Sequence, residues 1–227
     1  MKIGVLLPTF RDGASDAFAA ADAAERHGLH GVFAYDHLWP MGQPQRPSLA
    51  PFCLLSGVAA RHATLIVAPL VARVGLVATS VLVDQFRTLA MISDARVIVA
   101  LGTGDRLSED ENAAYGLAVH SAHERRALIG ETARALSGLP LWIGAGAAAT
   151  NLLAREIGAV LNLWDVSSAL VAAHGSDGPV SWAGNARSDL EVQLDELAAA
   201  GATWAVFSPT SDVARLGAWR RANEQTK

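Results

Sequence analysis

An aspartate and a histidine stand next to each other at the end of a short apolar run. Residues 31–35, GVFAY, have the composition of a buried strand, and Asp36 and His37 follow it directly. A histidine at a strand end can titrate near neutral pH and can exchange a proton with a ligand. The alternative is that Asp36 caps a turn and His37 is an ordinary surface residue. The residue types alone leave both interpretations open.

A second candidate is a glycine-rich turn that carries one acid. The apolar run 97–101 predicts a buried strand, which breaks at Gly102-Thr103-Gly104-Asp105. Parallel α/β proteins place their chemistry at such strand ends. Taken alone, Gly104 and Asp105 fit a tight turn with a helix-capping acid. They gain a role in a site only if this turn shares a face with the Asp-His pair.

A third candidate is a glycine-containing loop between a predicted strand and a predicted helix. Residues 144–149, GAGAAA, match a G-x-G-x-x-A pattern, with Asp165 about 20 residues further on. Glycines in such a loop let backbone N–H groups approach a phosphate at a helix N-terminus. The pattern follows the fifth strand, whereas dinucleotide-binding fingerprints usually follow the first. A Rossmann dehydrogenase with an open sheet is therefore kept as an alternative.

Regular alternation of apolar segments with amphipathic ones predicts how these residues are positioned. The predicted strands are 3–8, 31–35, 64–72, 96–101, 140–143, 159–164, 179–183 and 203–207. The predicted helices are 16–28, 49–61, 77–92, 121–137, 148–157, 166–173, 190–201 and 211–222, and Asp16 is expected to cap the first. Eight strand–helix units indicate one compact α/β domain over 1–227, a (β/α)8 TIM barrel with short loops after strands five to eight.

In a barrel every strand end opens onto the same face, so the residues that follow the strands converge there. Besides the two turns and the Asp-His pair, this set includes Trp39, Asn162 and Trp164. It is rich in glycine and aromatic residues. Such a mouth suits a flat aromatic ligand that carries an anionic tail.

Composition restricts the partners. The net charge is −4 and the pI about 5.9, which argues against nucleic acid or an anionic membrane as the main partner. Local arginines and backbone N–H groups can still bind a small anion. The apolar stretch 65–83 is interrupted by Pro69, Arg73 and Gly75, so no membrane span is expected.

Targeting, redox and metal signals are weak. The N-terminal apolar run before Pro8 is too short for a signal peptide, and a cytoplasmic location is expected. The single cysteine, Cys53, excludes an intramolecular disulfide and is expected in the core of its helix. His120 and His123 are more typical of a solvated helix start than of a metal site, and no metal is expected.

Four stretches resemble the luciferase-like flavin and deazaflavin oxidoreductases, and in particular their factor-420-dependent actinobacterial branch. They are GVFAYDHLWP (31–40), VARVGLVATSVLVDQFRTLAMIS (71–93), RVIVALGTGDRLSEDENAAYGL (96–117) and PLWIGAG (140–146). The resemblance implies a (β/α)8 barrel that binds factor 420, an 8-hydroxy-5-deazaflavin, at its C-terminal face. FMN is the alternative cofactor.

The resemblance also assigns roles near the second and third strands. Asp36 and His37 would bind the cofactor, His37 would act as proton donor or base, and Trp39 lies beside them. A bulge or cis peptide is expected at Ala72-Arg73, where the cofactor would also be contacted.

Further roles follow for the later strand ends. Thr103 and Gly104 would contact the cofactor, and the loop residues Gly144, Gly146 and Ala147 would hold its phosphate, with Asn162 nearby. Asp105 stands where the related dehydrogenases have a glutamate. The shorter side chain puts the same acid–base role in doubt.

The resemblance implies an oxidoreductase that moves a hydride between the deazaflavin and a small organic substrate. The alternatives are an FMN-dependent monooxygenase and a non-catalytic flavin-binding barrel. The chain has no room for the insertion that usually covers the pocket, and Arg187 is the one evident basic residue after strands six to eight, so a sugar phosphate is not expected. The pocket would be open or completed by another subunit. Helices 51–61 and 77–92 have enough apolar surface for a homodimer.

Overall fold

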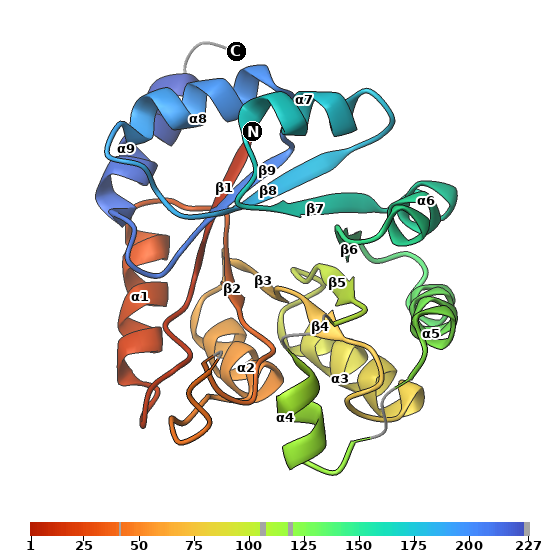
Figure 1. Cartoon of the computed structure of the whole chain (residues 1–227). Helices are drawn as coiled ribbons and strands as arrows, with labels where there is room; N and C mark the ends of the chain where they lie inside the picture. The colour runs from red at the N-terminus through yellow and green to blue at the C-terminus, as the bar shows by residue number, and fades with distance from the viewer. Residues whose placement is uncertain (41, 105–107, 118–119, 225–227) are drawn as a thin grey trace.

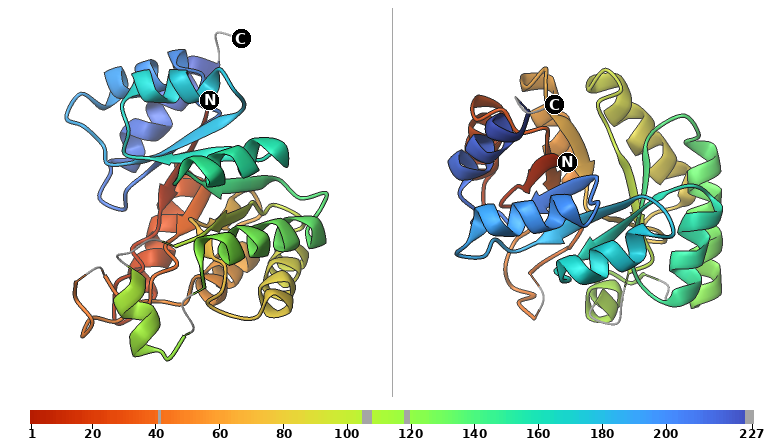
Figure 2. Two further views of the ribbon diagram at one scale, coloured as in Figure 1. Left: turned by 45° about the vertical axis from the view of Figure 1, so that its right-hand side comes forward. Right: turned by 90° about the horizontal axis from the view of Figure 1, so that it is seen from above.

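The chain folds as a barrel of parallel strands surrounded by helices (Figure 1; Figure 2, right). A computed structural model describes residues 1–40, 42–104, 108–117 and 120–224. Within them the strands are β1 (Lys2–Leu6), β2 (Gly31–Ala34), β3 (Ile66–Pro69), β4 (Ala72–Arg73), β5 (Val99–Gly102), β6 (Leu141–Gly144), β7 (Val160–Trp164), β8 (Val180–Gly184) and β9 (Trp204–Phe207). The helices are α1 (Ser15–Arg26), α2 (Pro51–Arg61), α3 (Thr79–Ile92), α4 (Glu109–Ala114), α5 (Ala122–Ala135), α6 (Ala148–Glu156), α7 (Ser168–Gly175), α8 (Leu190–Ala199) and α9 (Val213–Glu224).

The strand order is β3-β2-β1-β9-β8-β7-β6-β5-β4, and every pairing between these strands is parallel. β3 and β4 are two halves of one barrel strand, because β3 pairs with β2 while β4 pairs with β5. A bridge between Val67 and Val97 closes the ring. The predicted barrel is therefore confirmed, and the open Rossmann sheet is wrong.

The predicted loop lengths are also confirmed. Three residues separate β6 from α6 and β7 from α7, and five separate β8 from α8 and β9 from α9. These short connections hold the helices close against the barrel. The exception to the regular ring is α4, a short helix that lies at the lower end of the molecule in Figure 1 and in the left view of Figure 2.

Two local expectations on helices are wrong. Asp16 lies inside the first turn of α1, which begins at Ser15 without a capping side chain. The carboxylate accepts a hydrogen bond from Arg11 Nε at 3.3 Å, and an acid in a first turn still interacts favourably with the helix dipole. Cys53 is exposed, because α2 buries the next two positions, Leu54 and Leu55, against the sheet.

Three aromatic rings fill the middle of the barrel. Phe33 and Trp142 stack with ring centroids 5.6 Å apart, and Trp204 meets both rings edge-on at 5.6 and 5.7 Å. Their neighbours along each strand, such as Ala205 and Phe207 on β9, belong instead to the core between the sheet and the helices. This alternation follows from the two-residue period of a strand and separates an inner core from an outer one.

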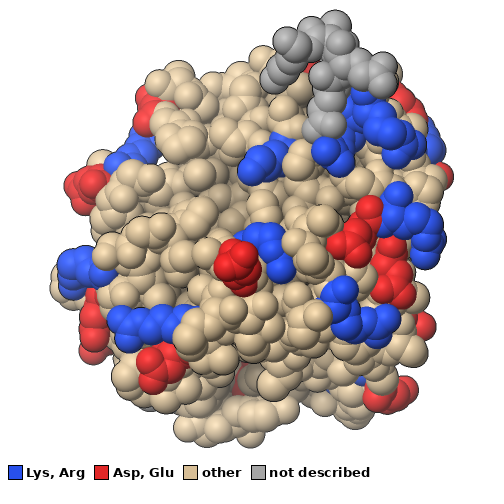
Figure 3. All heavy atoms as spheres, turned by 180° about the vertical axis from the view of Figure 1, so that it is seen from behind, with Lys and Arg blue, Asp and Glu red and all other residues tan. Residues whose placement is uncertain are grey.

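The outer surface is mixed in charge. The face in Figure 3 shows basic and acidic side chains interleaved, including one acidic and one basic group side by side near its centre, with uncharged surface between them. Within the described residues, no helix combines the length and the apolar character that crossing a bilayer requires. On α3, Val81, Met91 and Ile92 are exposed, and a homodimer through α2 and α3 stays a prediction.

A polar cluster ties α1 to the start of β3 at the N-terminal end of the barrel. Glu25 on α1 accepts a 2.6 Å hydrogen bond from the Thr64 hydroxyl, and its second oxygen lies 2.8 Å from His62 Nδ1. These two contacts, with the Thr64 hydroxyl first, lower the pKa of Glu25 despite its partial burial. The cluster therefore stabilises the fold only while the Glu25 carboxylate is charged.

We predict that this cluster contributes to acid unfolding. A carboxyl whose folded pKa lies below its unfolded value stabilises the protein above the unfolded pKa, and the contribution is lost as pH falls through the folded pKa. Glu25→Gln should therefore lower the free energy of unfolding at pH 7 and flatten its decline in the acid range. Urea titrations across pH measure this, with the exposed Glu131→Gln as control. Superimposable acid limbs of wild type and Glu25→Gln would contradict the prediction.

Candidate functional site

A buried glutamate from α4 binds the histidine that follows β2. Glu111 Oε1 lies 2.9 Å from His37 Nδ1, and Glu111 Oε2 accepts a 3.4 Å hydrogen bond from the Leu38 backbone N–H. The Glu111 side chain is 1% exposed and the His37 side chain 25%. With Nδ1 engaged by the carboxylate, Nε2 is the nitrogen left to exchange a proton with a ligand.

Arg73 on β4 completes this arrangement. Its Nη2 lies 2.7 Å from Glu111 Oε2, and its backbone N–H donates a 2.7 Å hydrogen bond to Asp36 Oδ2. Burial raises the pKa of Asp36, while the N–H and the charge of Arg73 oppose that rise. Asp36 and His37 are thus neither a simple turn cap nor a surface pair. The Asp36 side chain binds Arg73 of β4, and the His37 side chain binds Glu111 of α4.

The ends of β5 and β6 are lined by glycine. A Cβ at Gly102 would lie 2.4 Å from Val71 Cγ2, and one at Gly144 would lie 3.3 Å from the same atom. Gly104 has a φ of +67°, and the Thr103 hydroxyl donates to its carbonyl at 3.1 Å. The backbone therefore approaches Val71 closely, so that a Cβ would clash at Gly102 and would be tight at Gly144.

The cis peptide expected at Ala72-Arg73 lies at Leu70-Val71 instead. Ala72 and Arg73 pair regularly with Leu101 and Gly102 on β5, so the irregular step falls between β3 and β4. Ala72 itself is buried in the core between the sheet and the helices.

The loop after β6 has fewer free N–H groups than its glycines suggest. The Ala145 N–H donates to the Asn162 carbonyl at 2.8 Å, and the Gly146 N–H donates to Asn151 Oδ1 at 3.0 Å. Ala147 is the N-cap residue of α6, whose first turn follows. The Asn162 side chain is buried and donates to Ser181 Oγ at 3.0 Å. A phosphate held here would therefore use the first turn of α6.

Aromatic side chains lie at other strand ends. Tyr35 stacks on Phe10 at 5.5 Å and meets Trp164 edge-on at 6.0 Å. Trp164 is 47% exposed, whereas burial raises the pKa of Tyr35 to about 12. Trp39 is buried and packs against the exposed ring of Tyr115 beyond α4. The ends of β2 and β7 thus supply an aromatic surface at the same end of the barrel as His37, Arg73 and Glu111.

The predicted residues are brought together in part. Asp36, His37, Arg73 and Thr103 share the C-terminal end of the barrel, while Asp105 lies outside the described residues. Sequence reasoning missed Glu111, the residue that holds both His37 and Arg73. The acidic run 109–111 was visible, but nothing in it distinguishes the one glutamate that turns inward.

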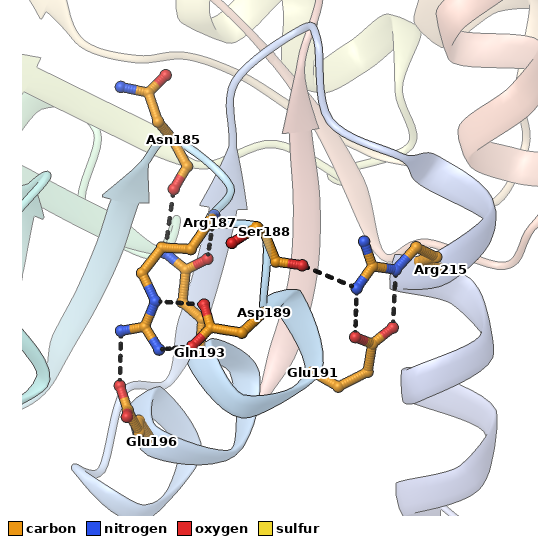
Figure 4. Close-up of polar contacts among 8 residues, drawn as sticks. All are labelled: Asn185, Arg187, Ser188, Asp189, Glu191, Gln193, Glu196 and Arg215. Carbon is orange, nitrogen blue, oxygen red and sulfur yellow. Dashed lines mark hydrogen bonds and ion pairs between the residues drawn. The ribbon is translucent and has the colours of Figure 1, made fainter.

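Arg187, the basic residue noted after β8, is already paired. Its guanidinium contacts Asp189 Oδ1 at 2.9 Å and Glu196 Oε2 at 2.8 Å, and Figure 4 shows both carboxylates around it. Arg215 is likewise bound by Glu191. These neutralised arginines offer little to a sugar phosphate.

We predict that Glu111→Gln destabilises the protein by about 3 kcal/mol, because breaking a buried ion pair leaves the Arg73 guanidinium without its counter-charge. Glu109→Gln, an exposed change on the same helix, should cost about 0.5 kcal/mol or less. Urea unfolding followed by tryptophan fluorescence measures both. Equal stabilities of the two variants would show that the Glu111 pair is not a structural element.

Comparison with known proteins assigns the chain to a family. The model of the family described as luciferase-like monooxygenase matches residues 1–140. No curated protein sequence matches the chain. Among solved structures, an F420-dependent secondary alcohol dehydrogenase in complex with an F420-acetone adduct has a TM-score of 0.77 at 12% identity, over 95% of both chains.

Two further structures have the same fold. The monooxygenase RslO1 from Streptomyces bottropensis has a TM-score of 0.75 at 13% identity over 100% of both chains. The coenzyme F420 dependent tetrahydromethanopterin reductase from Methanopyrus kandleri has a TM-score of 0.76 at 12% identity over 96% of both chains. Because the family model spans more than half of its length, the chain belongs to the luciferase-like monooxygenase family of oxidoreductases.

Proposed function

We propose that the protein moves a hydride between a deazaflavin coenzyme, factor 420, and a small organic substrate at the C-terminal mouth of the barrel. The observation that carries this proposal is the Glu111–His37 contact at 2.9 Å. Hydride transfer between a carbonyl and an alcohol also needs a proton at oxygen, and a carboxylate-bound histidine is suited to supply or accept it.

The mouth fits a flat ring system. Gly102 and Gly144 add no side chain at two neighbouring strand ends, where the Val71 side chain is the apolar group that lies against both. Gly146 has nothing within 4 Å of its missing Cβ, so the space beside it is open. Thr103, Gly104 and Trp39 are the further residues that we propose to contact the cofactor.

When bound, the deazaflavin supplies a ring carbon that accepts or releases a hydride. His37 Nε2 takes the hydroxyl proton of an alcohol as the hydride leaves its carbon, and it returns that proton in the reverse direction. Glu111 stabilises the imidazolium that forms, and it fixes the ring by its contact with Nδ1. Arg73 and α4 hold Glu111 in place.

FMN-dependent oxygenation is the alternative. The family model is described as a monooxygenase, and the RslO1 structure is also one. The Glu111–His37 pair favours hydride transfer, because hydride transfer to or from a substrate carbon requires a proton carrier at the substrate oxygen. A barrel that binds flavin without turnover would not need this pair.

We predict that His37→Ala lowers turnover by about 10²-fold or more while the cofactor dissociation constant changes by less than about threefold. Absorbance titrations with factor 420 and with FMN measure binding, and stopped-flow bleaching of the deazaflavin with a panel of alcohols measures turnover. His123→Ala, an exposed histidine at the start of α5, is the control. Tight FMN binding without factor 420 binding would overturn the proposed cofactor, and unchanged turnover in His37→Ala would overturn the proton role.

A further inference from the structure

A small cavity beside Arg73 is lined by positively charged and glycine residues from four elements. It lies between β4, the end of β5, α4 and the start of α5, and its walls include Arg73, Gly104, Asn112, His120 and Arg125. Its volume is about 20 Å³, room for about one water molecule. A single oxygen atom of a ligand fits this space.

The donors that border this cavity are buried and unused. Arg73 is 6% exposed, and its Nε and Nη1 atoms have no hydrogen-bond partner in the described chain. The same holds for Arg125 Nε, and an acceptor beside these donors, Asn112 Oδ1, is also without a partner. A buried N–H without a partner costs free energy, so several such groups around one cavity point to a missing acceptor.

The charge around the cavity is only partly compensated. Glu111 binds one end of the Arg73 guanidinium, at Nη2, which leaves most of its five N–H donors free. No carboxylate of the described residues lies within ion-pair distance of Arg125. By contrast, Arg187 and Arg215 are enclosed by acids (Figure 4). The arginines beside the cavity therefore differ from Arg187, in the loop before α8, and from Arg215 on α9.

The backbone keeps the cavity open. Gly75 has a φ of +84°, and a Cβ there would lie 2.9 Å from His120 Cδ2, so the imidazole packs directly on the glycine. The nearby N-terminus of α5 is already closed by a capping box between Ser121 and Glu124. The N-terminus of α5 is thus not free to bind a ligand. Arg73 and Arg125 are the groups that could bind one.

We propose that this cavity binds an anionic oxygen, from a carboxylate or a phosphate, through Arg73 and Arg125. The rest of the anionic group would lie at the cavity opening. The anion could belong to the cofactor tail or to an acidic substrate. Only the choice between these two molecules rests on the proposed function. Arg125 is the better residue to test, because Arg73 also holds Glu111.

The test is calorimetric titration of inorganic phosphate into the cofactor-free protein at constant ionic strength. We expect saturable binding that Arg125→Gln weakens by about tenfold or more, because charge-assisted hydrogen bonds are lost. Arg134→Gln makes the same charge change on the same helix away from the cavity and should leave the affinity unchanged. No saturable binding by wild type, or equal binding by Arg125→Gln, would overturn the site.

Paired flavins identify the source of the anion. Riboflavin lacks the phosphate of FMN, and the deazaflavin nucleoside lacks the phosphate tail of factor 420. A loss of affinity for the phosphate-bearing member of either pair, without a loss for its phosphate-free counterpart, in Arg125→Gln assigns the cavity to the cofactor tail. If Arg125→Gln binds these cofactors as tightly as the wild type but binds inorganic phosphate more weakly, the cavity is assigned to an acidic substrate. Failure of the proposed function appears separately, as absence of deazaflavin and flavin binding while the phosphate titration still shows the site.

Discussion

The contact among Phe33, Trp142 and Trp204 inside the barrel is the constraint on which the mouth depends. The three rings occupy the barrel interior with centroids 5.6 to 5.7 Å apart, so this space is filled before the strand ends are reached. The next inward positions on the same strands, toward the C-terminal end, are Tyr35 after β2, Gly144 on β6 and Val206 on β9. A packed floor thus lies beneath a layer that is aromatic beside β2, where Tyr35 stands, and without a side chain at the end of β6, where Gly144 stands.

Electrostatics supplies the second constraint at this end of the barrel. Arg73 and Glu111 are both buried, and isolated charges at such positions would be strongly unfavourable. Arg73 Nη2 and Glu111 Oε2 bind each other, His37 Nδ1 contacts Glu111 Oε1, and Asp36 accepts the Arg73 backbone N–H. Arg73 Nε and Nη1 have no partner in the described chain. Because α4 has only six residues, its own backbone contributes little stability, and the Glu111 contacts hold it over the mouth. The same pair therefore fixes the fold and orients the histidine.

The sequence was sufficient for elements whose signal is local. Apolar runs followed by glycine or polar residues located every barrel strand, and the order of those strands placed Asp36 and His37 on the same face as Thr103 and Gly104. The identity of the partner of His37 was not predictable. Glu111 lies 74 positions away, and whether it turns inward depends on how α4 sits against Arg73.

Other errors have similar causes. Asp16 has the residue type of a helix cap, but the helix starts one residue earlier and the carboxylate finds Arg11 instead. The irregular backbone step was expected two residues too late, because the pairing of β4 with β5 cannot be read from an apolar run. The sequence likewise shows arginine at positions 73, 125 and 187, but it does not show which of these arginines are paired with acidic side chains.

The mouth has two unlike sides, and this difference limits how a ligand can lie in it. Phe10, Tyr35 and Trp164 present ring faces and edges that suit an apolar, planar group. Arg73, with His37 and Glu111, presents charge and a titratable nitrogen. A molecule with a flat ring and polar reacting atoms gains from both sides only when those atoms lie toward His37. In the opposite orientation its polar atoms would face aromatic carbon and lose their hydrogen bonds. Orientation therefore follows from the chemistry of the two sides, without a covering lid.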